Sequence, residues 1–314
     1  MSVWSATNRF DPMTDSVDVA GSFNEWASTY TGLEMGEDYV YSTTLILAAD
    51  SVYEYKYRIN NSWDDNKAEF PGGGANRSVE VSGDSVLATV FFNDEELSDI
   101  TARVQVIHNS ADAAAATVDV YLNGEILIDD FAFRTASPFI DAPAAQEIMI
   151  DIAPASSSSV EESIYNLTAT LGWNESYILV ASGIVSAEGY TPATAFNIDI
   201  FDQAMEMAAD GNTTNVMVYH GSTDAPTVDV YEATGPTELV NDLMYSKFAG
   251  YLELPTQDYV LELRDETGTT MIQRYDAPLS TLELDGAAIS VIASGFLNPA
   301  DNSDGESFGL WVAL

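Results

Sequence analysis

The chain has 314 residues, of which 50 are acidic and 10 are basic, and its formal net charge is −40. This balance excludes nucleic acid and disfavours anionic membrane surfaces as partners, because both are bound by clustered lysine and arginine. Hydrophobic residues make up 46% of the chain, which is enough for packed cores, but no apolar run is long enough to cross a membrane.

The absence of cysteine removes disulfides, thiolate metal sites and a cysteine nucleophile from consideration. The opening MSVWSATNRF has no basic and no apolar region of the kind that a signal peptide needs. We therefore expect a protein of the cell surface or the extracellular space whose signal was removed before this numbering, or a virion component assembled inside a cell. Adaptation to a salty, halophilic or marine medium explains the charge, with surface solubility and cation binding as alternatives.

The first predicted domain covers residues 1–95 and contains three recognisable stretches. These are VDVAGSFNEW at 17–26, YEYKYRINNSWDDN at 53–66 and GGGANRSVEV at 72–81. Together they resemble the glycogen- and starch-binding module, an immunoglobulin-like sandwich related to the N-terminal domains of branching and debranching enzymes. The resemblance implies that this domain is a β-sandwich and that a polysaccharide is a candidate partner.

The same resemblance implies which residues hold the sugar. Mapped by motif, the sugar-binding positions are Trp26, Lys56, Trp63 and Asn76. An aromatic face stacks on the apolar face of a pyranose, while ammonium and amide groups bond its hydroxyls. The alternative is a spacer domain in which both tryptophans only pack against the protein.

After an acidic linker at 93–99, the rest of the chain consists of two similar copies of one segment. Residues from 103 read RVQVIHNSADAAAATVDVYLNG, and residues from 215 read NVMVYHGSTDAPTVDVYEATG. The only two histidines, His108 and His220, are 220 − 108 = 112 residues apart, and Phe196 and Phe308 keep the same offset. We predict two tandem domains, 100–208 and 213–314, joined by a polar linker at 209–214.

Period-two alternation predicts that the whole chain is all-β, as three consecutive immunoglobulin-like β-sandwiches. The expected strands of the repeats are VDVYLNG, EIMIDIAP, SYILVASG, FNIDIFD, VMVYHG, YVLELRD, AISVIASG and GLWVAL, with a turn at Asn123-Gly124. The only stretch with weak helical periodicity is 202–209, for which one or two helical turns are expected.

The repeated segments resemble a bacterial and archaeal domain family of unknown function with the pattern V-x-H-x-S-x-D-A-P-x-V-D-V-Y. The resemblance implies no activity. His108 with Asp112, and His220 with Asp224, give one imidazole and one carboxylate per copy, which is too few for a metal site. Neighbouring serines lack the strained elbow of a hydrolase nucleophile. We interpret these pairs as structural: the aspartate accepts backbone N–H bonds and the histidine bonds a carbonyl.

One further acidic loop is a weak calcium candidate. Residues 298–306 offer Asp301, Asp304 and Glu306, but they miss the EF-hand spacing, and a solvated loop is the alternative. No other cofactor or metal is expected. Because a unique active site has no reason to be duplicated with its scaffold, we expect no enzyme.

The sequence favours a non-enzymatic extracellular or cell-surface protein with a structural or adhesive role, for which assembly with its own copies into a filament or lattice is open. The first alternative is an α-glucan-binding protein that uses the first domain. Others are an accessory region of a larger secreted hydrolase and a virion surface protein.

Overall fold

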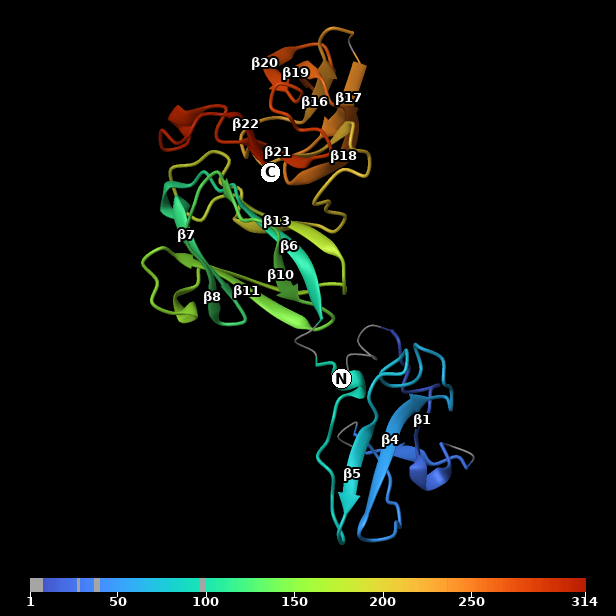
Figure 1. The fold of residues 1–314 in the computed structure, drawn as a ribbon. Helices are drawn as coiled ribbons and strands as arrows, with labels where there is room; N and C mark the ends of the chain where they lie inside the picture. The colour runs from blue at the N-terminus through green and yellow to red at the C-terminus, as the bar shows by residue number, and fades with distance from the viewer. Residues whose placement is uncertain (1–7, 27–28, 37–39, 97–99, 236) are drawn as a thin grey trace. The chain divides into compact units, whose positions relative to one another are not determined.

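The computed structural model describes residues 8–26, 29–36, 40–96, 100–235 and 237–314, which fall into two compact units, 1–101 and 102–314. Both are almost entirely β, which confirms the predicted fold class (Figure 1). Among the described residues, no helix is long and apolar enough to span a membrane. The predicted turns at 202–209 do not form, since this stretch contains only bends and a single bridge, Met207 to Ala287. Part of the predicted linker, 97–99, lies outside the described residues.

The first unit is built on one antiparallel sheet with strand order β3-β2-β1-β4-β5. Its elements are β1 (Val17–Gly21), η1 (Ser22–Asn24), β2 (Gly32–Met35), β3 (Tyr41–Ser42), β4 (Ser51–Ile59), β5 (Arg77–Val81) and η2 (Phe92–Asp94). The central pair is β1 and β4, in which Asp18 lies opposite Arg58 and Ala20 lies opposite Lys56. Because side chains two residues apart on a strand share a face, Lys56 and Arg58 project from the same side of β4.

The second unit holds the two repeats, called copy 1 and copy 2, each with two facing sheets. In copy 1 the sheets have the orders β10-β6-β13-β14 and β12-β11-β7-β8, and in copy 2 they have the orders β18-β15-β21-β22 and β17-β16-β19-β20. All eight predicted strands of the repeats form.

The elements of copy 1 are β6 (Thr101–His108), η4 (Ala113–Ala115), β7 (Thr117–Leu122), β8 (Glu125–Ala132), β9 (Thr135–Ala136), β10 (Ile140–Pro143), β11 (Glu147–Pro154), η5 (Val160–Glu162), β12 (Tyr165–Thr170), β13 (Ser176–Ser182) and β14 (Asn197–Phe201). The elements of copy 2 are β15 (Thr213–His220), β16 (Val228–Glu232), β17 (Thr237–Leu243), β18 (Lys247–Pro255), β19 (Asp258–Asp265), β20 (Met271–Pro278), β21 (Ala288–Ser294), η6 (Pro299–Asp301) and β22 (Gly309–Ala313).

The 112-residue offset holds in the strand register as well as in the sequence. The parallel pair β6–β13 places Arg103 opposite Ser176, and the parallel pair β15–β21 places Asn215 opposite Ala288. The predicted turn at Asn123-Gly124 joins β7 to β8, with both residues at positive φ (52° and 87°), as a tight hairpin requires.

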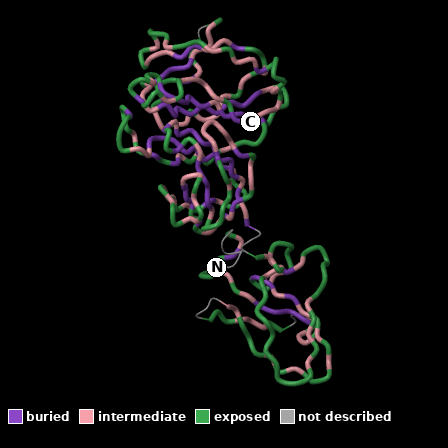
Figure 2. The backbone as a smooth tube through the Cα atoms, turned by 90° about the vertical axis from the view of Figure 1, so that its left-hand side faces the viewer, coloured by how far each residue is buried: buried purple, intermediate pink, exposed green. Residues whose placement is uncertain are grey.

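The two copies pack against each other and share a buried apolar cluster (Figures 1 and 2). Most members of this cluster occur as pairs that are 112 residues apart. These pairs are Ile107 and Tyr219, Val180 and Ile292, Phe201 and Ala313, Ala136 and Phe248, and Phe139 and Tyr251. Equivalent positions of the two copies therefore meet, which is the contact pattern of a pseudo-twofold axis.

A polar contact lies on this axis. Asn109 Nδ2 donates to the carbonyl of Gly221 at 3.0 Å, and 221 − 109 = 112, so equivalent positions touch. A Cβ at Gly221 would lie 2.0 Å from that Nδ2 atom, which explains the glycine. Residues 102–314 thus form one compact unit with an internal, self-complementary interface.

Candidate functional site

The four residues predicted to bind sugar all line one open pocket of the first unit, with a volume of about 400 Å³. The strand β4 supplies Lys56, the turn after β4 supplies Trp63, the segment after η1 supplies Trp26, and the approach to β5 supplies Asn76. The loop at 68–73 forms the remaining wall. Sequence segments that are far apart in the chain therefore meet at one place.

Trp26 and Trp63 form an angled pair of rings, with centroids 6.1 Å apart and planes at 54°. Trp26 is placed by a left-handed turn, since both Glu25 and Trp26 have positive φ (50° and 57°), and its N–H donates to the carbonyl of Gly21 at 2.8 Å. Trp63 keeps 49% of its surface exposed. Two tilted aromatic rings at an open pocket can stack on successive sugar rings of a curved chain.

Trp63 is held by a residue that the sequence reasoning missed. The guanidinium carbon of Arg58 lies 4.6 Å from the centre of the Trp63 ring, and Arg58 is itself buried. Its Nε donates to Asp18 Oδ2 at 3.2 Å, and Asn61 accepts a further bond. The signal was present in the sequence, because the alternation in Tyr-Lys-Tyr-Arg places both cations on one face of the strand.

Lys56 lines the pocket, but most of its hydrogen-bonding capacity is used within the protein. Only 7% of its surface is exposed, and its ammonium group donates to the carbonyls of Phe70 and Gly74 at 3.1 and 3.0 Å. Two of its three donors thus fix the loop that walls the pocket. Asn76 is exposed and donates to Glu54 at 3.3 Å.

The histidine–aspartate pairs of the two copies make matching sets of hydrogen bonds. His108 Nε2 lies 2.7 Å from the carbonyl of Ala115, and His220 Nε2 lies 2.9 Å from the carbonyl of Pro226. Both histidines are fully buried, and desolvation lowers the pKa of His108 to about 4. Each imidazole is therefore neutral at pH 7 and inaccessible to a substrate.

The aspartates tie two loops together in each copy. Asp112 accepts the N–H groups of Val185 and Ser186 at 2.9 and 2.6 Å. Asp224 accepts those of Leu297 and Asn298, both at 2.7 Å, and these positions are again 112 residues further on. The neighbouring serine hydroxyls are also engaged in hydrogen bonds within the protein. Ser110 donates to the carbonyl of Gly183 and Ser222 donates to that of Gly295, both at 2.7 Å.

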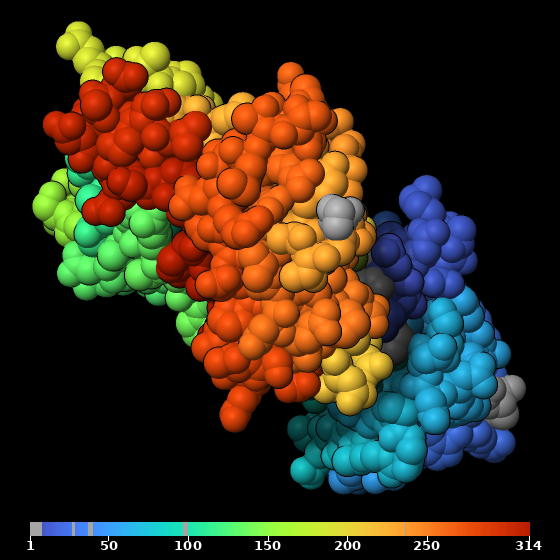
Figure 3. Space-filling view, turned by 90° about the horizontal axis from the view of Figure 1, so that it is seen from above, coloured from blue at the N-terminus to red at the C-terminus, as the bar shows by residue number. Residues whose placement is uncertain are grey.

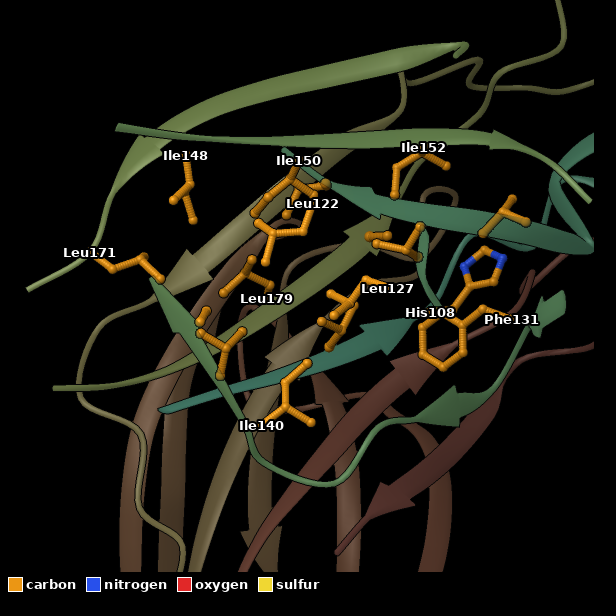
Figure 4. Close-up of a pocket in the computed structure, with 17 residues that line it drawn as sticks. His108, Leu122, Leu127, Phe131, Ile140, Ile148, Ile150, Ile152, Leu171 and Leu179 are labelled. Atoms are coloured by element: carbon orange, nitrogen blue, oxygen red, sulfur yellow. The ribbon is translucent and has the colours of Figure 1, made fainter. Parts of the chain in front are cut away.

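The cavity that His108 lines at one side is not a binding pocket. It is enclosed by the apolar core of copy 1, including Ile152 and Phe131, and its volume is about 20 Å³ (Figure 4). This space holds about one water molecule and no organic ligand.

The acidic loop at 298–306 packs between the copies. Asn302 is fully buried, with its Nδ2 donating to Asp224 at 3.1 Å and its Oδ1 accepting from Thr191 N–H at 2.9 Å. Figure 3 shows this red segment of copy 2 lying against the yellow and green of copy 1. In the part of the chain that the structure describes, no three His, Asp or Glu side chains gather to hold a metal, so Asp301, Asp304 and Glu306 form no such cluster.

Three solved structures show a distant likeness to this chain. The Bacillus anthracis TIE protein is 10% identical with a TM-score of 0.25, and the match covers 89% of this chain and 48% of that one. The chain therefore spans about half the length of that protein. A streptococcal virulence factor described for alpha-glucan binding is 9% identical (TM-score 0.20), with 61% of this chain and 93% of that one covered. Family 41 carbohydrate-binding modules from streptococcal virulence factors, described for alpha-glucan recognition, are 11% identical (TM-score 0.19) with the same coverage.

A search of curated proteins finds no match to this chain. A family model, described as a domain of unknown function (DUF4397), matches residues 102–202 and 214–302, which are copy 1 and copy 2. These two segments make up more than half of the sequence, and the chain belongs to the DUF4397 family.

Proposed function

We propose that this protein is a non-enzymatic binding protein of the cell surface or extracellular space, and that its first unit holds an α-glucan. The observation that carries the proposal is the angled pair formed by Trp26 and Trp63 at the mouth of an open pocket. Stacking on these rings would supply affinity, while Asn76 and the remaining donor of Lys56 would bond sugar hydroxyls.

Three features of the pocket support this proposal over a plain spacer domain. Trp63 is half-exposed although its ring is large and apolar, and Arg58 braces it. The opposite wall is fixed by Lys56. A surface that holds an exposed aromatic ring in one orientation loses little conformational entropy when a ligand stacks on it.

The two copies support a role as a rigid, non-catalytic body. Their histidines are buried, and the serines beside them are bonded to backbone carbonyls. The self-complementary interface between the copies is buried within the chain, so assembly into a filament or lattice would need a different surface. A structural role without a ligand is the second candidate, and it would apply if the first unit binds no sugar.

The test is a glucan titration of the full chain with a matched pair of variants. A soluble α-1,4-glucan should change tryptophan fluorescence, and Trp63→Ala should weaken binding about tenfold, the effect of losing roughly 1.4 kcal/mol of aromatic contact. The control is Trp173→Ala, which removes an exposed tryptophan of copy 1 and should leave affinity unchanged. If the native chain binds no glucan at millimolar concentration, while both variants remain folded, the glucan-binding proposal is wrong and the structural role is the remaining candidate.

A further inference from the structure

The sheets β12-β11-β7-β8 of copy 1 and β17-β16-β19-β20 of copy 2, here called the outer sheets, carry a buried acid at the same position but give it different partners. Aligned on their Val-Asp-Val-Tyr strands, the registers correspond position by position: Tyr121 lies opposite Asp151 in copy 1, and Tyr231 lies opposite Glu262 in copy 2. By the same registers, Ala153 of copy 1 stands where copy 2 has Arg264.

The next strand repeats this difference. Asn166 lies opposite Asp151 in copy 1, whereas Arg274 lies opposite Glu262 in copy 2. Copy 1 therefore keeps the acid of this outer face and has neither of the two arginines.

In copy 2 the buried acid is fully compensated. Glu262 is 7% exposed, and Arg264 donates to it from Nε and a terminal nitrogen at 3.2 and 2.6 Å. Arg274 donates to its other oxygen, and the two arginines hold the pKa of Glu262 below its usual value. The Arg264 guanidinium also lies 4.3 Å from the centre of the Tyr231 ring, so this side of the sheet encloses a cation.

In copy 1 the corresponding acid lacks this compensation. Asp151 is 4% exposed, and its Oδ2 is buried with no hydrogen-bond partner among the residues that the structure describes. On the same face of the sheet, Tyr121 lies opposite Asp151 in the strand register. The Tyr121 hydroxyl is 2.9 Å from Ser157 Oγ, which donates to Asp119 Oδ2 at 2.6 Å. Asp119 is itself 1% exposed, so two buried carboxylates share this face.

A buried carboxylate without a counter-charge is strongly unfavourable, and it is relieved either by a cation or by protonation. The polar side chains that the strand register and these hydrogen bonds place on this face offer carboxylate and hydroxyl oxygens, which are the ligands that hard cations prefer. We propose that copy 1 binds a hard cation, Ca²⁺ or Na⁺, at Asp151, in the place that the guanidinium groups of Arg264 and Arg274 occupy in copy 2.

This site lies in copy 1 and does not depend on glucan binding by the first unit. It is also distinct from the acidic loop at 298–306, which belongs to copy 2. The two copies thus share the fold, the strand register and an acid at this position, but only copy 2 has arginines beside that acid.

The cation can be tested on the full chain, stripped with EDTA and kept in choline chloride to screen the acidic surface. Calcium chloride is titrated calorimetrically against the native chain, Asp151→Asn and the control Asp129→Asn, which removes an exposed acid from β8. We expect one site that is lost, or weakened at least tenfold, in Asp151→Asn and retained in Asp129→Asn. If Ca²⁺ gives no such site but sodium chloride raises the unfolding temperature of the native chain over Asp151→Asn, the cation is Na⁺.

A second variant tests the substitution directly. Ala153→Arg combined with Asn166→Arg installs the arginines of copy 2, and it should abolish the cation response. The proposal is overturned if neither cation distinguishes the native chain from Asp151→Asn, or if NMR shows that the Asp151 carboxyl stays protonated at pH 7 with both cations present.

Discussion

The hydrogen bonds that Asp112 and Asp224 accept from a distant loop give the sharpest prediction about stability. Asp112 is 1% exposed and accepts from Val185 N–H, Ser186 N–H, the Ser186 hydroxyl and Ala114 N–H, at 2.6–2.9 Å. Replacing it with alanine leaves these donors without their acceptor. Water can serve the exposed Ala114 N–H and can reach part of the half-buried Val185 and Ser186. At about 1–3 kcal/mol for a donor left without an acceptor, we expect Asp112→Ala to cost about 3 kcal/mol of unfolding free energy in total.

The equivalent change in copy 2 should cost less, although its hydrogen bonds are as short. Asp224 is only partly buried, and its donors at Leu297 and Asn298 are exposed, so water can replace the lost carboxylate. We expect Asp224→Ala to cost about 1 kcal/mol. Denaturant unfolding of the full chain measures both, with amide hydrogen exchange at Val185 and at Leu297 as local readouts.

The charge of Asp112 adds a pH signature. Burial raises its pKa, but the hydrogen bonds from Ser186 and Ala114 outweigh burial and place the pKa below the ordinary 3.8. A depressed pKa means that the stabilisation is full above pH 4 and is lost as pH falls through the folded-state pKa. The advantage of the native chain over Asp112→Asn should therefore shrink below pH 4. The reasoning is refuted if Asp224→Ala costs more than Asp112→Ala, or if Asp112→Ala is as harmless as Asp129→Ala on the surface.

Three further predictions follow from burial, packing and charge. Folding lowers the pKa of His108 from 6.5 to about 4, so the unfolded chain takes up the proton first as the pH falls. The free energy of unfolding should therefore drop by about 3 kcal/mol between pH 6.5 and pH 4. Denaturant unfolding at a series of pH values should show a smaller drop in His108→Gln. Gly221→Ala places a methyl group 2.0 Å from Asn109 Nδ2 and should cost about 1–3 kcal/mol, with Asn109→Gly restoring part of the loss in a double-mutant cycle. The unfolding temperature should rise from low to molar sodium chloride, because salt screens repulsion at a net charge of −40, and a flat or falling calorimetric trend would contradict a halophilic origin of the composition.

The sequence alone was sufficient for the repeat and for eight of its strands, including most of the central ones. Alternating apolar residues have to face a core, so VDVYLNG and SYILVASG could be assigned as strands without any knowledge of their neighbours. The signature residues were also readable, because a buried aspartate that follows a strand end requires nearby N–H donors. Strand β17 was missed because its exposed and buried residues do not alternate cleanly.

Only the tertiary structure decided what each charged side chain contacts. Sequence spacing could not show that the N–H donors to Asp112 come from 73 and 74 residues away, nor that Lys56 is bonded to a loop. It also could not show that the repeats meet through equivalent faces, because self-complementarity depends on surfaces from several strands at once. Periodicity reports whether a side chain is inside or outside, whereas partners are set by strand register and sheet packing, which bring distant residues together. The difference between Asp151 and Glu262 is visible only through that register, which places Asp151 where copy 2 holds an acid bonded to two arginines.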